Sequence, residues 1–509
     1  MLSSSLRFIV GALTALLIYG HFWRKSVGGT MRIMPGRKID ISINIDAIKN
    51  MYSGPVFRYA PNYIVMNTVD GARGIYAGPK TNVQKAPFYK FLHMNNSTAV
   101  ASVIDKTSHA RKRHIVSQGF SDAALRSLEP YIIENIEQWC DLLGTNITDG
   151  RKVQDNEWSE AKNMSQWTNY LTFDVLGDIC FGKPFGLLTS SAHRYLPQML
   201  LSNMYAFQAV GNSPLLPFWK PIIEKLGFHK LIFPTISSNR EKFQAFVLRT
   251  TGERMDKFKS EKSSGIGQRK DFFYWLVNAT DADGNPGYTM PELWLEARTL
   301  LTAGSDTSSI VLAAAFFYIC HNPRVLEKLQ AELRSTFDES AEIRAGPKMN
   351  SCTYLRAVID ETLRMTPPVP SSIPREVQVG GITIGGHYFP KSTILGTSAY
   401  CLQHNDDSFL DPFTYRPERW IVDEGNGVTV EDLAAAKAAF IPFSLGSRGC
   451  VGKSLAYAEI SMALARGFWM FDVRLKEGDN TGEGTYGDFM LADVFVGERD
   501  GPWVEFKPR

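Results

Sequence analysis

The sequence predicts a mainly α-helical protein with small β-sheets, that is, an α+β fold class. One helical pattern runs from Thr289 to Cys320, about 31 residues or roughly 46 Å, which is long enough to cross a whole domain. Most of residues 108–251 has a helical pattern, whereas short alternating runs at 56–66 and 373–394 predict two small sheet regions. Because strands and helices do not alternate along the chain, a doubly wound dinucleotide-binding fold is excluded.

The long helix has start and stop signals of its own. Thr289 and Glu292 have the spacing of a capping box, and Pro291 falls in the first turn. The pattern ends just before Pro323. Gly304, in the middle of the helix, costs about 1 kcal/mol relative to alanine. We therefore expect a local opening of the helix at Gly304.

Breaks and turns divide the remaining chain. The helical pattern is interrupted at Gly182-Lys183-Pro184 and at Ser213-Pro214. Residues 257–270 (KFKSEKSSGIGQRK) are charged and contain glycine and serine, which predicts a solvated loop. Glycine pairs at 380–381 and 385–386 mark turns in the second sheet region.

The composition indicates a globular chain with a large core. Of the 509 residues, 44% are hydrophobic and 12% aromatic. The formal net charge of +3 is too small to indicate nucleic-acid binding. The six cysteines are scattered without Cys-x-x-Cys spacing, which argues against a disulfide framework or a zinc site and fits a reducing compartment.

Residues 1–27 are predicted to be an N-terminal membrane anchor. Phe8 to Trp23 contains no Asp, Glu, Lys or Arg, and a helix from Leu2 to Trp23 would rise about 33 Å against a hydrocarbon core of about 30 Å. Basic residues from Arg24 onward favour keeping the rest of the chain in the cytosol. A cleaved signal peptide is the alternative, but no Ala-x-Ala site follows.

One cysteine stands at the end of a glycine-rich loop, directly before a predicted helix at 451–468. Free N–H groups and the helix dipole stabilise a thiolate placed there, which makes it a metal ligand or a nucleophile. Glycines at 446, 449 and 452 let a large flat molecule approach the backbone. Phe443 can pack against such a molecule and Arg448 can pair with its carboxylates. The set suits haem, although an inert buried cysteine is the alternative.

The segment 443–452 resembles, at every required position, the haem-binding signature of cytochrome P450 monooxygenases, Phe-x-x-Gly-x-Arg-x-Cys-x-Gly. The resemblance implies that Cys450 is the axial thiolate ligand of haem b, iron protoporphyrin IX. It also implies haem contacts from Phe443, Arg448, Gly446 and Gly452. The resemblance covers the chain from about Tyr52 to the end and implies the cytochrome P450 fold, a single catalytic domain with an N-terminal transmembrane helix.

A second motif lies within the long helix. The residues Ala303-Gly304-Ser305-Asp306-Thr307 resemble the oxygen-activation segment of the family. The resemblance implies that Thr307 hydrogen-bonds the bound oxygen and that Asp306 relays protons from solvent. From the residues alone, a Thr307 hydroxyl bonded to the carbonyl four residues earlier, with Asp306 on a wet face, explains the pattern equally well.

A third motif pairs Glu361 with Arg364, one helical turn apart. Such pairs usually lie on the protein surface and contribute little to stability. Pro417-Glu418-Arg419-Trp420 follows at the spacing at which the family supplies a second arginine. The resemblance therefore implies a buried ion-pair network of Glu361, Arg364 and Arg419 that positions the Cys450 loop.

A fourth motif places His109 and Arg113 on one helix face. A basic run of this kind is usually solvated. In the family the corresponding helix contacts the haem propionates with Trp or His and with Arg, so the resemblance implies this role for Arg113 and for His109. Arg375 is implied as a further propionate partner.

The substrate pocket is expected to be mostly apolar. By family topology it draws on residues 91–104, 204–210, 300–303, 369–373 and 489–492. These residues suggest a bulky hydrophobic substrate oriented by few polar groups. The same pattern is also what core residues produce.

The resemblance implies a haem-thiolate monooxygenase that inserts one oxygen atom from O₂ into a C–H or C=C bond of an apolar small molecule. Electrons would come from an NADPH–cytochrome P450 reductase, with cytochrome b5 as a second donor. Sequence segments such as Gly54-Pro55-Val56-Phe57-Arg58 look most like those of filamentous-fungal family members from secondary-metabolite pathways. Residues 28–50 are then a hinge, and residues 51–509 a catalytic domain facing the cytosol from the endoplasmic reticulum membrane.

Two other functions remain open at this point. The first is a haem-thiolate isomerase, dehydratase or peroxide-driven enzyme that needs no reductase, against which the Asp306-Thr307 pair argues. The second is a haem-binding sensor or electron carrier without catalysis, which would need neither that pair nor an apolar pocket.

Overall fold

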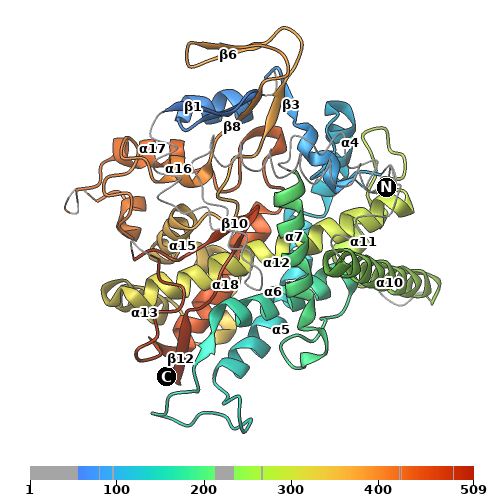
Figure 1. Cartoon of the computed structure of the whole chain (residues 1–509). Coiled ribbons are helices and arrows are strands. Elements are labelled where there is room, and N and C mark those ends of the chain that lie inside the picture. Colours follow the sequence, from blue (N-terminus) through green and yellow to red (C-terminus); the bar gives the residue numbers. More distant parts are fainter. Residues whose placement is uncertain are drawn as a thin grey trace, which may run out of the picture.

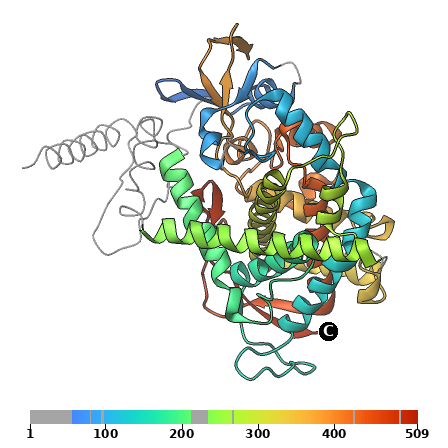
Figure 2. The same cartoon turned by 90° about the vertical axis from the view of Figure 1, so that its right-hand side faces the viewer.

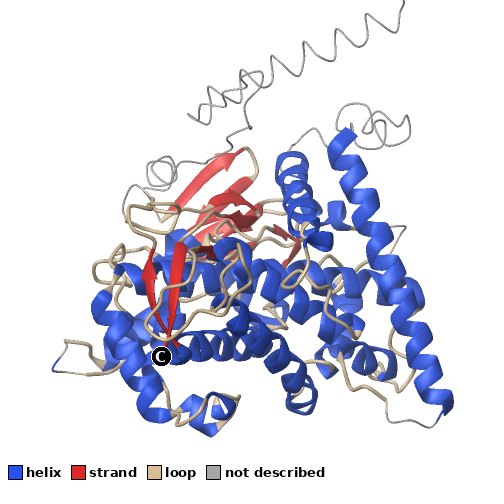
Figure 3. Ribbon diagram, turned by 90° about the horizontal axis from the view of Figure 1, so that it is seen from below, coloured by secondary structure: helices blue, strands red, loops and turns tan. Residues whose placement is uncertain are grey.

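The computed structural model describes residues 55–78, 81–93, 97–211, 234–264, 268–423, 425, 427–484 and 487–509. Helices form most of this part of the chain (Figure 3), and the strands lie in separate small sheets rather than in one layer (Figure 1). The predicted anchor (1–27) and hinge (28–50) lie outside the described residues. A mainly helical domain with small sheets is therefore confirmed for the described part.

The α-helices of the described part are α3 (Val69–Ala72), α4 (Lys106–Gln118), α5 (Asp122–Leu143), α6 (Met164–Phe181), α7 (Tyr195–Gly211), α10 (Pro234–Ser264), α11 (Phe272–Asn278), α12 (Met290–His321), α13 (Pro323–Thr336), α14 (Pro347–Asn350), α15 (Thr353–Met365), α16 (Ala399–Gln403), α17 (Val430–Ala439) and α18 (Lys453–Met470). Shorter turns of helix are η1 (Arg73–Ala77), η2 (Pro87–Leu92), η3 (Ser191–His193), η4 (Ser340–Glu342), η5 (Pro417–Trp420) and η7 (Gly446–Arg448).

The strands form four sheets. A five-stranded sheet has the order β1-β2-β8-β5-β3, a three-stranded sheet the order β4-β12-β9, and β10-β11 and β6-β7 are two-stranded. Their bounds are β1 (Val56–Ala60), β2 (Tyr63–Met66), β3 (Val83–Lys85), β4 (Lys162–Asn163), β5 (Arg375–Val377), β6 (Ile382–Ile384), β7 (His387–Phe389), β8 (Ile394–Gly396), β9 (Phe471–Leu475), β10 (Ala492–Val494), β11 (Val496–Glu498) and β12 (Trp503–Pro508). Both predicted sheet regions meet in the five-stranded sheet.

Helix α12 crosses the middle of the molecule (Figure 1) and packs against α6, α10, α15 and α18. Its start is fixed by the predicted capping box, in which the Thr289 N–H donates to Glu292 Oε2 at 3.0 Å. Residues 308–319 are all buried. Within the described ranges it is the one helix whose length and composition would suit a membrane span, but two thirds of its apolar window (67%) is buried inside the protein. It is a core helix.

Two expectations about local structure are wrong. Residues 257–264 belong to the long helix α10 (Figure 2), because the charged stretch still places Phe258 in the core at 4% exposure. Helix α12 also continues without a break through Gly304. A Cβ at Gly304 would lie 3.0 Å from Leu176 Cδ1 on α6, so close packing of the two helices accounts for this glycine.

The hydrophobic interior has two parts. The larger core lies among the helices, where Phe316 of α12 stacks on Phe468 of α18 at 5.0 Å. The smaller core lies against the five-stranded sheet and includes Val377 and Leu395. The loop before α18 joins them, since Phe443 packs against the larger core and Leu445 against the smaller one. This loop is thus anchored on both sides.

Candidate functional site

The loop at 443–452 folds back on itself through backbone hydrogen bonds. The Cys450 N–H donates to Phe443 O at 2.8 Å, and the Gly449 N–H donates to Gly446 O at 3.0 Å. Helix α18 begins at Lys453, so the cysteine stands immediately before a helix N-terminus, as predicted. The Phe443 ring lies 5.2 Å from the Tyr457 ring of α18, which holds the start of the loop against the helix.

The loop glycines differ in why they are needed. Gly446 has φ +68°, and a Cβ there would lie 2.2 Å from Tyr76 O. Any side chain at this position would therefore be strained and would clash with the backbone of η1. Gly452 has φ −83°, and a Cβ there would meet Phe120 at an ordinary 3.6 Å. The protein's own atoms thus require glycine at 446 but not at 452.

Cys450 is accessible, whereas the other five cysteines are buried or half-buried. Burial nevertheless raises the pKa of the Cys450 thiol, against lowering contributions from the Gly452 N–H and the charges of Arg113 and Lys453. The expected thiolate is therefore not produced by the helix N-terminus alone. A bound metal cation deprotonates a coordinating thiol outright.

Basic side chains from four elements lie close to one another beside the cysteine loop. We call them the cationic cluster; it consists of Lys85 of β3, His109 and Arg113 of α4, Arg375 of β5 and Arg448 of η7. Arg448 donates to Val103 O at 2.8 Å and to Ile104 O at 2.7 Å. Arg113 donates to Gly449 O at 2.6 Å. The four predicted members are thus brought to one region, together with Lys85.

Burial and the neighbouring positive charges lower pKa values within the cationic cluster. Burial and then the charge of Arg448 lower the pKa of His109 to about 3. Burial and then Arg375 lower the pKa of Arg448 to about 10. The pKa of Lys85 is well below its usual range because of burial and then Arg375 and Arg448. Such an excess of positive charge favours a ligand with carboxylates.

On α12 the segment 303–307 presents an open face within a buried helix. Ala303 is exposed and Thr307 half-buried, although Ser305, Asp306 and the following turns are buried. The Thr307 hydroxyl donates to Ala303 O at 2.6 Å, the bond that a purely structural threonine would make. Asp306 is not on a wet face. Its Oδ1 lies 2.8 Å from Nη1 of Arg499, and the two side chains are 13% and 4% exposed.

The predicted ion pairs lie in one buried cluster. Glu361 accepts two hydrogen bonds from Arg364, both at 2.8 Å, and one from Arg419 at 2.9 Å. It also accepts from Trp420 Nε1 and the Arg416 N–H, both at 2.9 Å. The guanidinium of Arg364 and then that of Arg419 outweigh the effect of burial and lower the pKa of Glu361.

A glutamine connects this cluster to the cysteine loop. Arg364 donates to Gln403 O at 2.9 Å, and Gln403 Nε2 donates to Arg364 O at 3.0 Å. The same amide accepts from the Ile441 N–H at 3.0 Å through its Oε1. Because Ile441 is two residues before Phe443, the ion-pair cluster fixes the place where the loop begins.

These features agree with the comparisons to known proteins. A family model described as cytochrome P450 matches residues 46–491. The chain belongs to the cytochrome P450 family. The cytochrome P450 monooxygenase atnE of Emericella nidulans is 37% identical over 461 residues, which cover 90% of this chain and 85% of that protein. The cytochrome P450 monooxygenase apf7 of Gibberella fujikuroi is 34% identical over 485 residues, with coverages of 92% and 89%.

A third relative is the cytochrome P450 monooxygenase AKT7 of Alternaria alternata, 33% identical over 466 residues and covering 89% of this chain and 85% of its own. This cytochrome P450 is accordingly a haem-thiolate monooxygenase, an enzyme that uses haem ligated by a cysteine thiolate, O₂ and a small-molecule substrate, with redox partners.

Of the segments predicted to form the substrate pocket of this cytochrome P450, one contributes to the hydrophobic core and another contacts the hairpin β10–β11. Phe489 belongs to the core, because it is 3% exposed and its ring lies 5.2 Å from that of Phe317. Ser371 donates to Asp493 at the start of the hairpin β10–β11. At the tip of that hairpin the Phe495 ring lies 6.0 Å from the Phe88 ring of η2. Residues 94–96 lie outside the described part.

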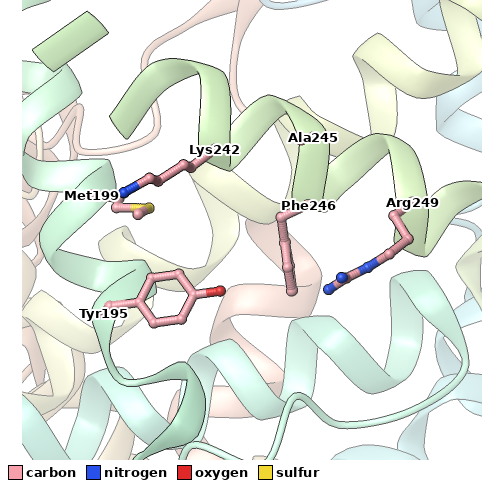
Figure 4. A pocket seen from close by; sticks show the side chains of 6 residues that line it. All are labelled: Tyr195, Met199, Lys242, Ala245, Phe246 and Arg249. Carbon is pink, nitrogen blue, oxygen red and sulfur yellow. The ribbon is translucent and has the colours of Figure 1, made fainter. Parts of the chain in front are cut away.

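A separate groove of about 590 Å³ lies between α7 and α10 and contains none of the predicted site residues (Figure 4). Sequence reasoning also missed three residues of the site, Lys85, Gln403 and Arg499. Lys85 and Arg499 are isolated basic residues in short strands or turns, and Gln403 ends a short helix. None of them belongs to a local pattern that could have identified it.

Proposed function

We propose that Cys450 of this cytochrome P450 ligates the iron of haem b and that the cationic cluster binds the haem propionates. The observation that carries the proposal is the exposed Cys450 thiol at the end of a loop whose Gly449 O accepts from Arg113 at 2.6 Å, next to the other members of the cationic cluster. The residues fit such a group, since the thiol suits iron and the excess positive charge suits two carboxylates. When bound, haem supplies one-electron redox chemistry and activates O₂.

On the oxygen side we assign Thr307 as the residue that holds a hydroxyl proton at the open face of α12. The exposed Ala303 and half-buried Thr307 support this assignment. Asp306 is its partner for proton transfer with water. Phe443, Gly446, Gly452 and Arg448 shape the cysteine loop, and Glu361, Arg364 and Arg419 fix it in place.

For the substrate we infer a bulky apolar small molecule of fungal secondary metabolism, which undergoes hydroxylation, epoxidation or several successive oxidations. The fungal origin of the relatives supports this inference. An NADPH–cytochrome P450 reductase, with cytochrome b5 as a second donor, would supply the electrons. The apolar residues 1–27 and the basic residues that follow support single-pass anchoring in the endoplasmic reticulum membrane, with residues 28–50 as hinge and residues 51–509 as the cytosolic domain.

The test is expression of the full chain with a reductase in a host that makes candidate apolar precursors, followed by comparison of metabolites. We expect a new product whose added oxygen comes from ¹⁸O₂ and whose formation requires NADPH. The Cys450→Ala variant should lose this product, whereas Cys401→Ala, which changes a half-buried cysteine elsewhere, should retain it. A product that forms without O₂ or NADPH would instead support the isomerase or dehydratase alternative.

A further inference from the structure

The ion pair between Asp306 and Arg499 is the starting point. Nη1 of Arg499 lies 2.8 Å from Asp306 Oδ1, and Nη2 lies 3.0 Å from Asn169 Oδ1 on α6. Nη2 also contacts the Ser309 hydroxyl. The Arg499 side chain is 4% exposed. An arginine keeps its charge at any physiological pH, and this contact directs the Asp306 carboxylate toward the hairpin β10–β11.

Arg499 directly follows that hairpin. Strands β10 and β11 pair with Val494 opposite Val496, so Phe495 alone forms the turn. Phe495 has φ +82°, a conformation that bulky side chains rarely adopt. Its N–H donates to Asp493 Oδ1 at 3.0 Å. Asp493 in turn accepts from Ser371. The tip of the hairpin is therefore held by contacts with the segment 369–373.

The same tip borders the space expected for the substrate. The half-buried rings of Phe495 and Phe88 lie 6.0 Å apart, and the predicted substrate segment 369–373 holds the tip. Helix α7 contacts both η2 and β10. Only three residues, 496–498, thus separate Phe495 at the expected substrate space from the arginine whose guanidinium holds Asp306.

We propose that Arg499 is a positioning residue that restrains Asp306 until a substrate seated against Phe495 displaces the hairpin β10–β11. With the pocket empty, the ion pair keeps the Asp306 carboxylate from exchanging protons with water beside Thr307. Displacement of the hairpin breaks the ion pair and frees the carboxylate. The arrangement limits wasteful reduction, in which O₂, two electrons from the reductase and two protons form H₂O₂. This inference rests on the proposed haem-dependent function.

The first experiment measures H₂O₂ release and NADPH oxidation by the haem-loaded full chain with reductase and without substrate. Arg499→Gln removes the charge and should raise both rates several-fold. Arg499→Lys keeps the charge and should stay near the wild-type rates, and Asp306→Asn combined with Arg499→Gln should cancel the rise. Arg474→Gln, which breaks an exposed pair with Glu505 at 2.7 Å, is the matched control and should change neither rate.

The second experiment does not depend on turnover. Hydrogen–deuterium exchange is measured over residues 492–499 of the haem-loaded protein with and without 4-phenylimidazole, whose phenyl ring suits an apolar pocket. The probe should accelerate exchange in the wild type and have a smaller effect in Arg499→Gln, where exchange is already fast.

The two ideas fail in different ways. Wild-type protein that carries no thiolate-ligated haem would overturn the proposed function. Wild-type protein that carries such haem, but whose Arg499→Gln variant releases H₂O₂ at the wild-type rate or whose hairpin exchange does not respond to the bound probe, would overturn the role of Arg499.

Discussion

The site contains two buried acid–arginine contacts that are built differently. Glu361, behind the cysteine loop, accepts five N–H donors, two from Arg364 and one each from Arg419, Trp420 and the Arg416 backbone. Asp306, on α12, is held by Arg499, whose Nε has no hydrogen-bond partner among the described residues. A carboxylate with every lone pair engaged is fixed, whereas one held by a single incompletely paired arginine can be released.

The two contacts are therefore suited to different roles, a structural role for Glu361 and a chemical role for Asp306. In our proposal the fixed pair holds the loop of the iron-ligating thiol in place, and the weaker pair lies where a proton is delivered. A third buried acid, Glu459 of α18, has no cationic partner in the part of the chain that the structure describes. Burial raises its pKa to about 8, against a hydrogen bond with Ser308, and its Oε1 has no partner among the described residues.

The largest effect is expected for Glu361→Gln. Removing one partner of a buried ion pair costs about 3–5 kcal/mol, because Arg364 and Arg419 would be left without their carboxylate. We expect protein that fails to retain haem, measured as the haem-to-protein ratio after purification. Glu342→Gln breaks an exposed pair with Lys348 and should change the free energy of unfolding by about 1 kcal/mol or less. Full haem content in Glu361→Gln would contradict a structural role.

The next effect concerns pH. The raised pKa of Glu459 means that its contribution to stability is fully present below the unfolded value of 4.5 and is lost as pH rises toward about 8. For Glu361 the pKa is lowered, so its contribution is present above 4.5 and is lost as pH falls below that value. Glu459→Gln should therefore gain a few kcal/mol relative to wild type between pH 5 and pH 8, measured by denaturant unfolding. A gain that does not vary with pH would argue against a buried neutral carboxyl.

A smaller effect should distinguish the two loop glycines. Gly446→Ala combines a positive φ with a clash against Tyr76 O and should lower the free energy of unfolding by about 1–3 kcal/mol. Gly452→Ala should change the stability of the haem-free chain by no more than about 0.5 kcal/mol and should act on haem affinity instead. Equal losses of stability in the two variants would contradict this distinction.

The sequence predicted those parts of the site whose residues are close together in the chain. The cysteine loop, the Glu361–Arg364 pair, the long helix and its capping box all depend on spacings of a few residues. Arg499 and Asp306 are 193 positions apart, and Gln403 reaches Ile441 across 38, so only the packed fold brings them together. The length of α10 was missed because its C-terminal part is charged on all but its buried face.

Two further properties of the site depend on the packed fold and could not be predicted from the sequence. The spacing around Gly304 does not reveal that Leu176 packs against it. The position of Cys450 before a helix suggested a lowered thiol pKa, but burial, which depends on the whole fold, has the opposite effect.

The reduced carbon monoxide complex of the purified full chain tests the ligation by Cys450 most directly. The wild type should give the absorption spectrum characteristic of a thiolate-ligated haem, Cys401→Ala should give the same spectrum, and Cys450→Ala should lose it. A Cys450→Ala variant that still shows the thiolate-type spectrum would contradict the assignment of Cys450 as the iron ligand.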